Sequence, residues 1–317
     1  MSANRAEQSD SDLNEGRSIA AHTNAVENRT LPVIGFIGLG AMGKPMALNL
    51  LAAGYPLVVF DLSATRLDAL VNAGAEAALS VENLVGRVNI IVTSLPSSSA
   101  FVEVAEQRIL PNVQPGQILI DFGTVTPPET RRLATCFAQQ EAVLIDAPVS
   151  GGPSGAQKAD LYLFVGGEPD AVAQVRPMLE AVGGAAKLTH CGPSGCGQVV
   201  KGVNQLMMGL VDAAYLEAIS FGVNAGVEID VIAQAIGKEG RWRQDFSAVA
   251  QRIAQGNGPN VGVKFRELPY FLLEADESDF PLPLTKILYE FCDKGERIVT
   301  DDNRPAPSFW HELTHSF

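Results

Sequence analysis

The sequence is short of basic residues, so it has no excess of positive charge with which to hold a nucleic acid. Its 23 Lys and Arg residues stand against 36 Asp and Glu, and the formal net charge at pH 7 is −13. Nucleic acids and anionic membrane surfaces are held mainly by clustered cations. We therefore expect neither of them as a partner, and a site for an anionic substrate must be a local cationic spot.

Cysteine and histidine are also scarce, with four of each among 317 residues. The cysteines are Cys136, Cys191, Cys196 and Cys292. They include no C-x-x-C pair and are too few for a disulfide framework, so we expect reduced thiols in a cytoplasmic protein. His311 and His315 are spaced to share a helix face but lack the H-E-x-x-H pattern, and no metal site is predicted.

Long hydrophobic runs are absent as well. No stretch reaches 18 uncharged apolar residues, so the sequence predicts no membrane-spanning segment. Residues 1–30 are polar and net acidic, unlike a secretory signal or a basic mitochondrial presequence, and we expect a disordered or variable tail. The rest of the chain is long enough for two globular domains.

The most informative stretch of the chain is a glycine-rich turn between a predicted strand and a predicted helix. The apolar run Val33–Ile37 predicts a buried strand, and the residues after Gly43 have helical periodicity. In a G-x-G-x-x-G pattern, Gly38 permits a tight turn, Gly40 lets a pyrophosphate approach, and Gly43 lets the helix pack closely on the strand. Free N–H groups at the start of the helix suit the phosphates. The pattern predicts a dinucleotide-binding Rossmann unit.

An acidic residue follows the next predicted strand. Leu57–Phe60 is that strand, and Asp61 comes 18 residues after Gly43, where a carboxylate accepts hydrogen bonds from the adenosine ribose. Its charge would repel the 2′-phosphate of NADP, although Arg66 nearby could reduce this repulsion. NAD is therefore the preferred cofactor over NADP.

Further predicted strands alternate with predicted helices up to about residue 195. The strands are 89–93, 117–121, 142–146 and 161–165, and the helices are 63–71, 101–109, 128–139 and 170–182. This alternation predicts a doubly wound parallel sheet with helices on both faces. Ligands bind beyond the carboxyl ends of such strands, which places Leu95, Pro96 and Thr124 on one rim beside the glycine turn.

The chain after residue 195 has a different pattern. From Gly197 to Gly226 the sequence predicts one helix about 45 Å long that is apolar on nearly every face. Such a helix is buried between two domains or between two subunits, so we expect a homodimer or homotetramer. Helical patterns follow at 229–237, 247–255, 264–275 and 283–294. We therefore divide the chain into a tail at 1–30, a Rossmann domain at 31–195 and an all-α domain at 196–317.

Two further segments have the residues for chemistry. Ser150-Gly151-Gly152, just after a strand, offers a hydroxyl and consecutive N–H groups that suit a carboxylate, although ordinary glycine-rich loops share this pattern. Lys201 lies one turn into the long helix, with Asn204 on the same face. Burying a lysine in so apolar a helix costs free energy unless it has an interaction partner or a functional role. If Lys201 lies on the surface instead, it is an ordinary solvated charge.

Together these motifs make the chain similar to the β-hydroxyacid dehydrogenase family. Its members include 3-hydroxyisobutyrate dehydrogenase, tartronate semialdehyde reductase and succinic semialdehyde reductases, which are 6-phosphogluconate dehydrogenase-like enzymes. The family pattern G-F-I-G-L-G-x-M-G-x-x-M-A-x-N-L is met at residues 35–50, D-x-P-V-S-G-G-x-x-G-A at 146–156, and G-x-G-x-x-x-K-x-x-N at 195–204. The resemblance covers about residues 33–295.

The resemblance implies a role for each matching residue. Lys201 matches the catalytic lysine and Asn204 the asparagine that orients the substrate, while Ser150, Gly151 and Gly152 match the loop that holds the substrate carboxylate. With the glycine motif, the implied cofactor-binding residues are Gly38, Leu39, Gly40, Ala41, Met42, Gly43, Asp61, Leu95, Pro96, Thr124 and Arg266.

The chain departs from the family pattern at three places, of which the smallest change is Asp-Phe-Gly-Thr at residues 121–124, where Asp-x-Ser-Thr is more usual. Residues 159–161 read Ala-Asp-Leu where the family usually has Gly-Thr-Leu. The family's Lys-Asp-Leu aligns with residues 266–268, where Arg266 keeps the charge of the lysine but not its geometry, and Lys264 is a rival for the same contact.

The function that the resemblance implies is reversible hydride transfer between a nicotinamide cofactor and a small 3- or 4-hydroxyacid or its semialdehyde. Lys201 would be the general acid and base. One alternative is an NADPH-dependent imine reductase, a class that shares the fold but typically has another residue at the lysine position. The other is a non-catalytic dinucleotide-binding module. Residues 241–243, Arg-Trp-Arg, are either a second cationic spot for a dicarboxylic substrate or a solvated helix end.

Overall fold

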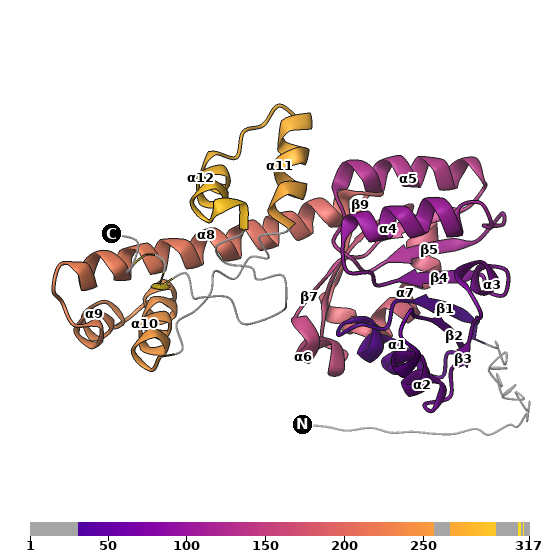
Figure 1. The fold of residues 1–317 in the computed structure, drawn as a ribbon, viewed down its shortest axis with the longest axis horizontal. Coiled ribbons are helices and arrows are strands. Elements are labelled where there is room, and N and C mark those ends of the chain that lie inside the picture. The colour runs from indigo at the N-terminus through magenta and orange to yellow at the C-terminus, as the bar shows by residue number, and fades with distance from the viewer. Residues whose placement is uncertain (1–30, 257–266, 296–309, 312, 314–317) are drawn as a thin grey trace, which may run out of the picture. The chain divides into compact units, whose positions relative to one another are not determined.

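The computed structural model of the protein describes residues 31–256, 267–295, 310, 311 and 313 (Figure 1). The strands of this part of the chain are β1 (Ile34–Ile37), β2 (Leu57–Phe60), β3 (Glu76–Ala77), β4 (Ile90–Thr93), β5 (Ile118–Asp121), β6 (Val143–Asp146), β7 (Val149–Ser150), β8 (Tyr162–Gly166) and β9 (Leu188–Gly192). The first seven helices are α1 (Gly43–Ala52), α2 (Ala64–Val71), α3 (Val81–Val85), α4 (Ser98–Val104), α5 (Pro127–Gln139), α6 (Gly152–Gln157) and α7 (Pro169–Gly183). The later helices are α8 (Cys196–Asn224), α9 (Ile229–Ile236), α10 (Arg241–Ala254), α11 (Leu268–Glu277) and α12 (Pro283–Phe291). Short turns of other helix types are η1 (Ala105–Ile109), η2 (Ala185–Lys187) and η4 (Asp293–Gly295).

The strands form one mostly parallel sheet, which confirms the doubly wound α/β fold. Their order is β3-β2-β1-β4-β5-β6-β8-β7, with β9 beside β8. Strands β1 to β6 are parallel, whereas β8 runs antiparallel to both β6 and β7. The parallel pairing that the sequence predicted does not hold between β8 and its neighbours β6 and β7. The connection from β7 to β8 contains only the six-residue α6, and a parallel crossover needs a dozen or more residues.

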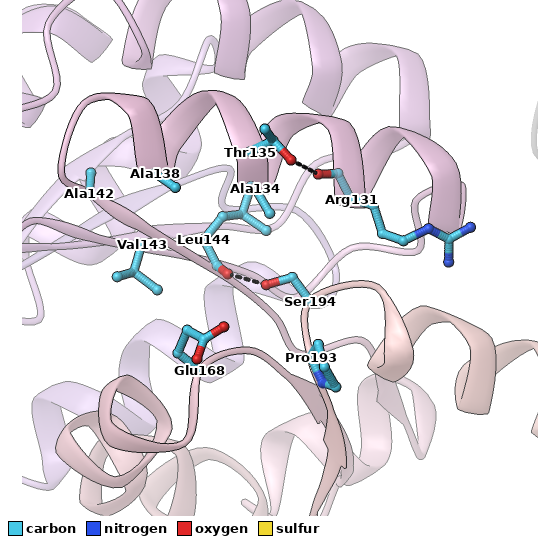
Figure 2. Close-up of a pocket in the computed structure, with 10 residues that line it drawn as sticks. All are labelled: Arg131, Ala134, Thr135, Ala138, Ala142, Val143, Leu144, Glu168, Pro193 and Ser194. Atoms are coloured by element: carbon cyan, nitrogen blue, oxygen red, sulfur yellow. Dashed lines mark hydrogen bonds between the residues drawn. The ribbon is translucent and has the colours of Figure 1, made fainter.

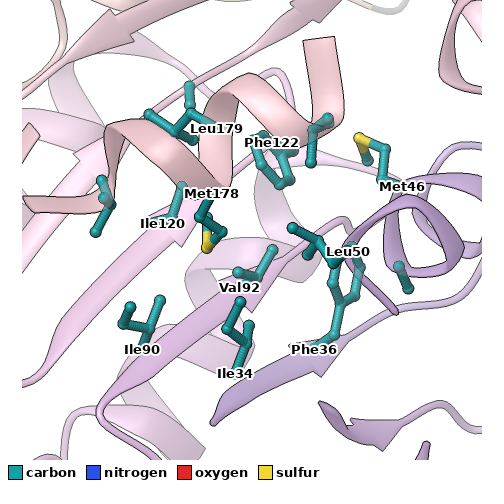
Figure 3. Close-up of a cluster of buried hydrophobic side chains, with 14 of the residues drawn as sticks. Ile34, Phe36, Met46, Leu50, Ile90, Val92, Ile120, Phe122, Met178 and Leu179 are labelled. Atoms are coloured by element: carbon teal, nitrogen blue, oxygen red, sulfur yellow. The ribbon is translucent and has the colours of Figure 1, made fainter. Parts of the chain in front are cut away.

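Two hydrophobic clusters hold helices against the two faces of the sheet. On one face, Ile34 and Phe36 of β1 pack with Met46 and Leu50 of α1 and with Met178 of α7 (Figure 3). On the other face, the cluster joins α3, α4 and α5 to the sheet; it includes Leu84, Phe101, Leu119, Leu133 and Phe137. Burying each large side chain of this kind contributes about 1.5–3 kcal/mol to folding. The two layers leave the carboxyl ends of the parallel strands free for a site.

The elements described after Gly195 are helices, and α8 is the longest of them. Its 29 residues match the predicted long helix to within two residues at each end, and they span about 44 Å. Helices α9, α10, α11 and α12 all contact α8 (Figure 1). A third cluster around Leu216, Ile219 and Phe246 holds the far end of α8 against α9 and α10. The division of the chain into domains near residue 195 stays a prediction.

Helix α8 is less buried within the chain than its composition suggested. Val203, Met207 and Phe221 are 57%, 59% and 78% exposed, because α9 to α12 cover only part of its surface. By length and apolar composition alone α8 could cross a membrane, a criterion that core helices of soluble proteins also meet. Within the described part of the chain, therefore, only part of the surface of α8 is buried as predicted.

Candidate active site

The three glycines after β1 have three different surroundings. Gly38 has a φ of +92°, and a Cβ there would lie 2.5 Å from the carbonyl oxygen of Ser94. A Cβ at Gly43 would lie 1.9 Å from the carbonyl oxygen of Gly38, because α1 crosses close to the turn. A Cβ at Gly40 would have no neighbour within 4 Å. The turn is thus tight at Gly38, closely packed at Gly43 and open at Gly40, which fits a dinucleotide pyrophosphate at the start of α1.

Asp61, directly after β2, holds this turn in place. Its Oδ2 accepts a hydrogen bond from the N–H of Leu39 at 2.7 Å, and its Oδ1 accepts one from the N–H of Ser63 at 2.8 Å. Nη1 of Arg66 lies 3.7 Å from Oδ1. The carboxylate that the sequence assigned to the ribose therefore lies beside the glycine turn, and a guanidinium lies on its other side. Ala41 and Met42 complete the turn before α1 begins.

The predicted rim residues follow the carboxyl ends of two neighbouring strands. Leu95 and Pro96 come after β4, and Thr124 comes after β5, whose last residue, Asp121, pairs with Thr93 of β4. Gln198 of α8 binds the segment around Thr124: its Nε2 donates to the carbonyl of Gly123 at 3.0 Å. Its Oε1 accepts from the N–H of Val125 at 3.1 Å. Sequence reasoning missed Gln198, since nothing in its motif position marks it.

Lys201 and Asn204 contact the segment around Ser150, which the resemblance assigns to the substrate carboxylate. Lys201 is 7% exposed, and its Nζ donates to the carbonyl oxygen of Val149 at 2.8 Å. Nδ2 of Asn204 donates to Oγ of Ser150 at 3.3 Å. Gly151 and Gly152 follow with φ values of +135° and +62°, and Gly152 begins α6 instead of continuing a loop. The structure thus brings the two motifs together, although they are about 50 residues apart in the chain.

Two buried carboxyl groups lie side by side at the ends of β5 and β6. Asp121 and Asp146 are register partners and are 1% and 0% exposed. Burial raises the pKa of Asp121 to about 7, and the nearby Thr93 hydroxyl and Gly123 N–H offset this only in part. Burial also raises the pKa of Asp146, against hydrogen bonds from backbone N–H groups at the start of α8. Sequence analysis assigned no role to either group, although Asp146 is the first residue of the motif at 146–156.

Other candidates from the sequence lie elsewhere or outside the described residues. Arg266 and Lys264 belong to the part of the chain that is not described, so the contact at that position stays a prediction. At the start of α10, the Arg243 guanidinium lies 4.6 Å from the centre of the Trp242 ring and donates to the carbonyl of Ile236 at 3.2 Å. These contacts fit a helix end better than a substrate site. In the described ranges no three His, Cys, Asp or Glu side chains cluster as metal ligands.

A cavity of about 340 Å³ opens on another part of the surface (Figure 2). It lies between α5, β6 and the turn before α8, where Ser194 Oγ donates to the carbonyl of Leu144 at 2.9 Å. Its lining includes none of the predicted site residues. We therefore place the candidate active site at the strand ends and not in this cavity.

Comparison with known proteins agrees with this geometry. Residues 33–192 match the family model for the NAD binding domain of 6-phosphogluconate dehydrogenase. The chain is 37% identical to the NAD-dependent L-serine dehydrogenase of Pseudomonas aeruginosa over 66% of this chain and 71% of that protein. It is 32% identical to the 2-(hydroxymethyl)glutarate dehydrogenase of Eubacterium barkeri over 89% of this chain and 95% of that protein.

Solved structures with the same fold are more distant in sequence. A Mycobacterium tuberculosis 3-hydroxyisobutyrate dehydrogenase, solved with L-serine, has a TM-score of 0.76 at 23% identity and covers 90% of this chain and 99% of its own. An imine reductase from Pseudomonas sp. has a TM-score of 0.56 at 21% identity, over 83% of this chain and 93% of its own. The fold is shared by both classes, whereas the sequence relatives at 37% and 32% identity are both named as dehydrogenases. The chain belongs to the β-hydroxyacid dehydrogenase family.

Proposed function

We propose that this enzyme transfers a hydride reversibly between NAD and a small 3- or 4-hydroxyacid or its semialdehyde, with Lys201 as the general acid and base. The observation that carries the proposal is the contact between α8 and β7. Lys201 and Asn204 reach Val149 and Ser150 there, beside the glycine pair that suits a carboxylate. The nicotinamide cofactor, when bound, accepts the hydride in oxidation and supplies it in reduction.

Each residue at this contact has a distinct task in the proposal. The Ser150 hydroxyl and the N–H groups of Gly151 and Gly152 hold the substrate carboxylate. Neutral Lys201 takes the hydroxyl proton during oxidation, and its ammonium form returns a proton to the carbonyl oxygen during reduction. Asn204 holds the substrate oxygen near the lysine. Because Lys201 is nearly buried, water competes little for its proton.

The preference for NAD over NADP rests on Asp61. Its carboxylate would accept hydrogen bonds from the ribose hydroxyls and repel a 2′-phosphate. Arg66, whose guanidinium lies 3.7 Å from the Asp61 carboxylate, would instead favour NADP. Both cofactors therefore belong in the first assay.

The relatives suggest which substrates to try. L-Serine, 2-(hydroxymethyl)glutarate and 3-hydroxyisobutyrate all have the form HO–CH₂–CH(R)–COO⁻ and differ only in R. We propose that this chain acts on the same class of 3-hydroxyacids. The test is a panel that varies R as ammonium, methyl and carboxyethyl, with 4-hydroxybutyrate as the longer homologue, measured with NAD and NADP by absorbance at 340 nm. Turnover of one member supports the proposal, and no turnover while cofactor still binds contradicts it.

Two alternatives give different results in the same assay. A cyclic imine reduced with NADPH, without oxidation of any hydroxyacid, would indicate imine reductase chemistry. Cofactor binding without turnover of either class would indicate a non-catalytic module. The intact Lys201–Asn204 pair and its contact with Ser150 favour the dehydrogenase.

We also propose that the chain forms a homodimer or homotetramer in the cytoplasm. Val203, Met207, Met208, Val211 and Phe221 expose apolar surface along α8, and a second copy could cover them. Size-exclusion chromatography with light scattering tests the assembly, because a monomer at micromolar concentration would contradict it. Fractionation of cells that produce the full chain tests the compartment.

A further inference from the structure

We infer that Asp146 is the positioning residue for Lys201: its buried carboxylate binds the start of α8 and so sets where the lysine meets the substrate loop. This inference rests on the proposed function, because it concerns the geometry of that site. Asp146 ends β6, and two residues further on begins β7, the strand that Lys201 and Asn204 contact.

The contacts of Asp146 with α8 are short and use both oxygens. Oδ1 accepts a hydrogen bond from the N–H of Gly195 at 2.7 Å, and Oδ2 accepts one from the N–H of Gln198 at 2.9 Å. The N–H groups of the first turn of a helix have no partner within the helix, and they carry its positive dipole end. A carboxylate from a neighbouring strand therefore satisfies these donors and fixes the helix start relative to the sheet.

Glycines beside the Asp146 carboxylate leave it space that the side chain of any other residue at those positions would fill. A Cβ at Gly166, its partner on β8, would lie 2.4 Å from Oδ1, and the three atoms nearest to it would all belong to the Asp146 carboxyl group. A Cβ at Gly197 on α8 would lie 2.7 Å from Oδ2 and 2.3 Å from the carbonyl oxygen of Phe164. Two glycines, one on each side, thus allow the helix and the strand to approach the same carboxylate.

The short segment from the end of β6 to β7 contacts the start of α8 at two places. At the first place, the Asp146 carboxylate accepts hydrogen bonds from the N–H groups of Gly195 and Gln198. At the second, one helical turn further along α8, Lys201 donates a hydrogen bond to the carbonyl of Val149. Because these hydrogen bonds hold the first turn of α8, the helix cannot slide or rotate against β7 without breaking the bonds to Asp146. Displacement of reacting groups by about 1 Å lowers rates by about 10²-fold, so loss of this constraint should appear in kcat.

The neighbouring strand provides a matched control. Asp121 is equally buried and pairs with Asp146 in register, but its Oδ2 makes no hydrogen bond to any described residue, and its Oδ1 accepts from Thr93 at 2.7 Å. Asp121→Asn therefore makes the same chemical change at the same depth without removing a bond to α8. In Asp146→Asn, by contrast, an NH₂ group replaces one of two acceptors and faces a backbone donor.

The experiment compares Asp146→Asn with Asp121→Asn in the full-length enzyme. We expect Asp146→Asn to lower kcat about 10²-fold while the KM for the cofactor changes less than twofold, and Asp121→Asn to stay within about threefold of wild type. The pH dependence gives a second readout, because removing the Asp146 charge exposes the positive end of α8 to the Lys201 ammonium. The midpoint of the oxidation profile should then move to lower pH. Asp121 and Cys191 also lie near Asp146, Cys196 lies near Cys191, and all three are unchanged in this variant.

Amide hydrogen exchange separates this inference from the proposed function. In Asp146→Asn, residues 195–204 should lose protection even if wild type turns over no substrate of the panel, whereas Asp121→Asn should leave them protected. A kcat for Asp146→Asn equal to that of Asp121→Asn, or unchanged exchange in 195–204, would overturn the inference. If Asp146→Asn does not fold, Gly166→Ala displaces the same carboxyl without removing its charge, and the same lowering of kcat is expected from it.

Discussion

The backbone N–H of Leu39 donates to Oδ2 of Asp61 at 2.7 Å, so one carboxylate joins the glycine turn to the end of β2. The acid that would bind the ribose is thereby held by the turn that would bind the pyrophosphate. A change at Asp61 should alter both the affinity for the cofactor and the choice between its two forms.

We predict that Asp61→Ala lowers the ratio of kcat/KM with NAD to kcat/KM with NADP at least 10-fold. The variant loses the ribose acceptor, and it removes a negative charge that lies 3.7 Å from Arg66. Steady-state kinetics with both cofactors measure the ratio. Asp68→Ala, an exposed acid on α2, is the charge-matched control and should leave the ratio unchanged. An unchanged ratio in Asp61→Ala would remove the basis for preferring NAD.

A second prediction concerns Ala159, where the chain departs from the family's glycine. Ala159 has a φ of +51°, in the left-handed region that costs a residue with a Cβ about 1–2 kcal/mol. Ala159→Gly should stabilise the protein by about 0.5–1 kcal/mol, since the greater freedom of glycine in the unfolded chain offsets part of the gain. Urea unfolding measures the change. Ala134→Gly in the middle of α5 should instead destabilise by about 1 kcal/mol.

A third prediction concerns the pH dependence of stability. Burial raises the pKa of Asp121 from 3.8 to about 7, so the folded protein keeps a proton that the unfolded chain releases between these values. Stability is therefore lost as the pH rises from about 4 to about 7. The Asp121→Asn variant has no such proton to release. The free energy of unfolding of the variant should therefore rise relative to that of wild type between pH 4 and pH 7, by at most about 4 kcal/mol.

The measurement for Asp121 is the free energy of unfolding of both proteins at pH 5, 6, 7 and 8. A difference between them that is the same at every pH would show that the carboxyl is not held protonated by burial. Asp68→Asn, on the exposed side of α2, serves as the control for a change of charge alone.

Most elements of the fold could be predicted because buried apolar runs and glycines mark them locally. Strands such as Leu57–Phe60 and the long helix near Cys196–Asn224 lie within two residues of the predicted bounds. The strand β9 escaped prediction, since Leu188–Gly192 buries only one side chain deeply and has no alternating pattern. The direction of β8 escaped it too, because hydrophobic periodicity does not distinguish parallel from antiparallel pairing.

Some residues of the candidate site could be predicted from the sequence, and others could be found only from the structure. Lys201, Asn204 and Ser150 could be found because their motifs place them at fixed spacing within short segments. Asp146 and Gln198 could not, because their partners are between 49 and 75 residues away in the chain and depend on how α8 meets the sheet. The partial exposure of α8 could not be predicted either, because the composition of a helix does not show which of its sides is covered by the rest of the chain.

If Lys201 transfers the proton, hydride transfer in Lys201→Met, measured in a single turnover, should be slow. Methionine keeps the length and apolar stem of the side chain but has no proton to give or take. We predict a rate of NADH formation lowered about 10²–10⁴-fold, with cofactor affinity unchanged, while Lys187→Met, a lysine that pairs with Asp160, stays near wild type. A Lys201→Met enzyme that forms NADH at close to the wild-type rate would show that Lys201 is not the proton-transfer group.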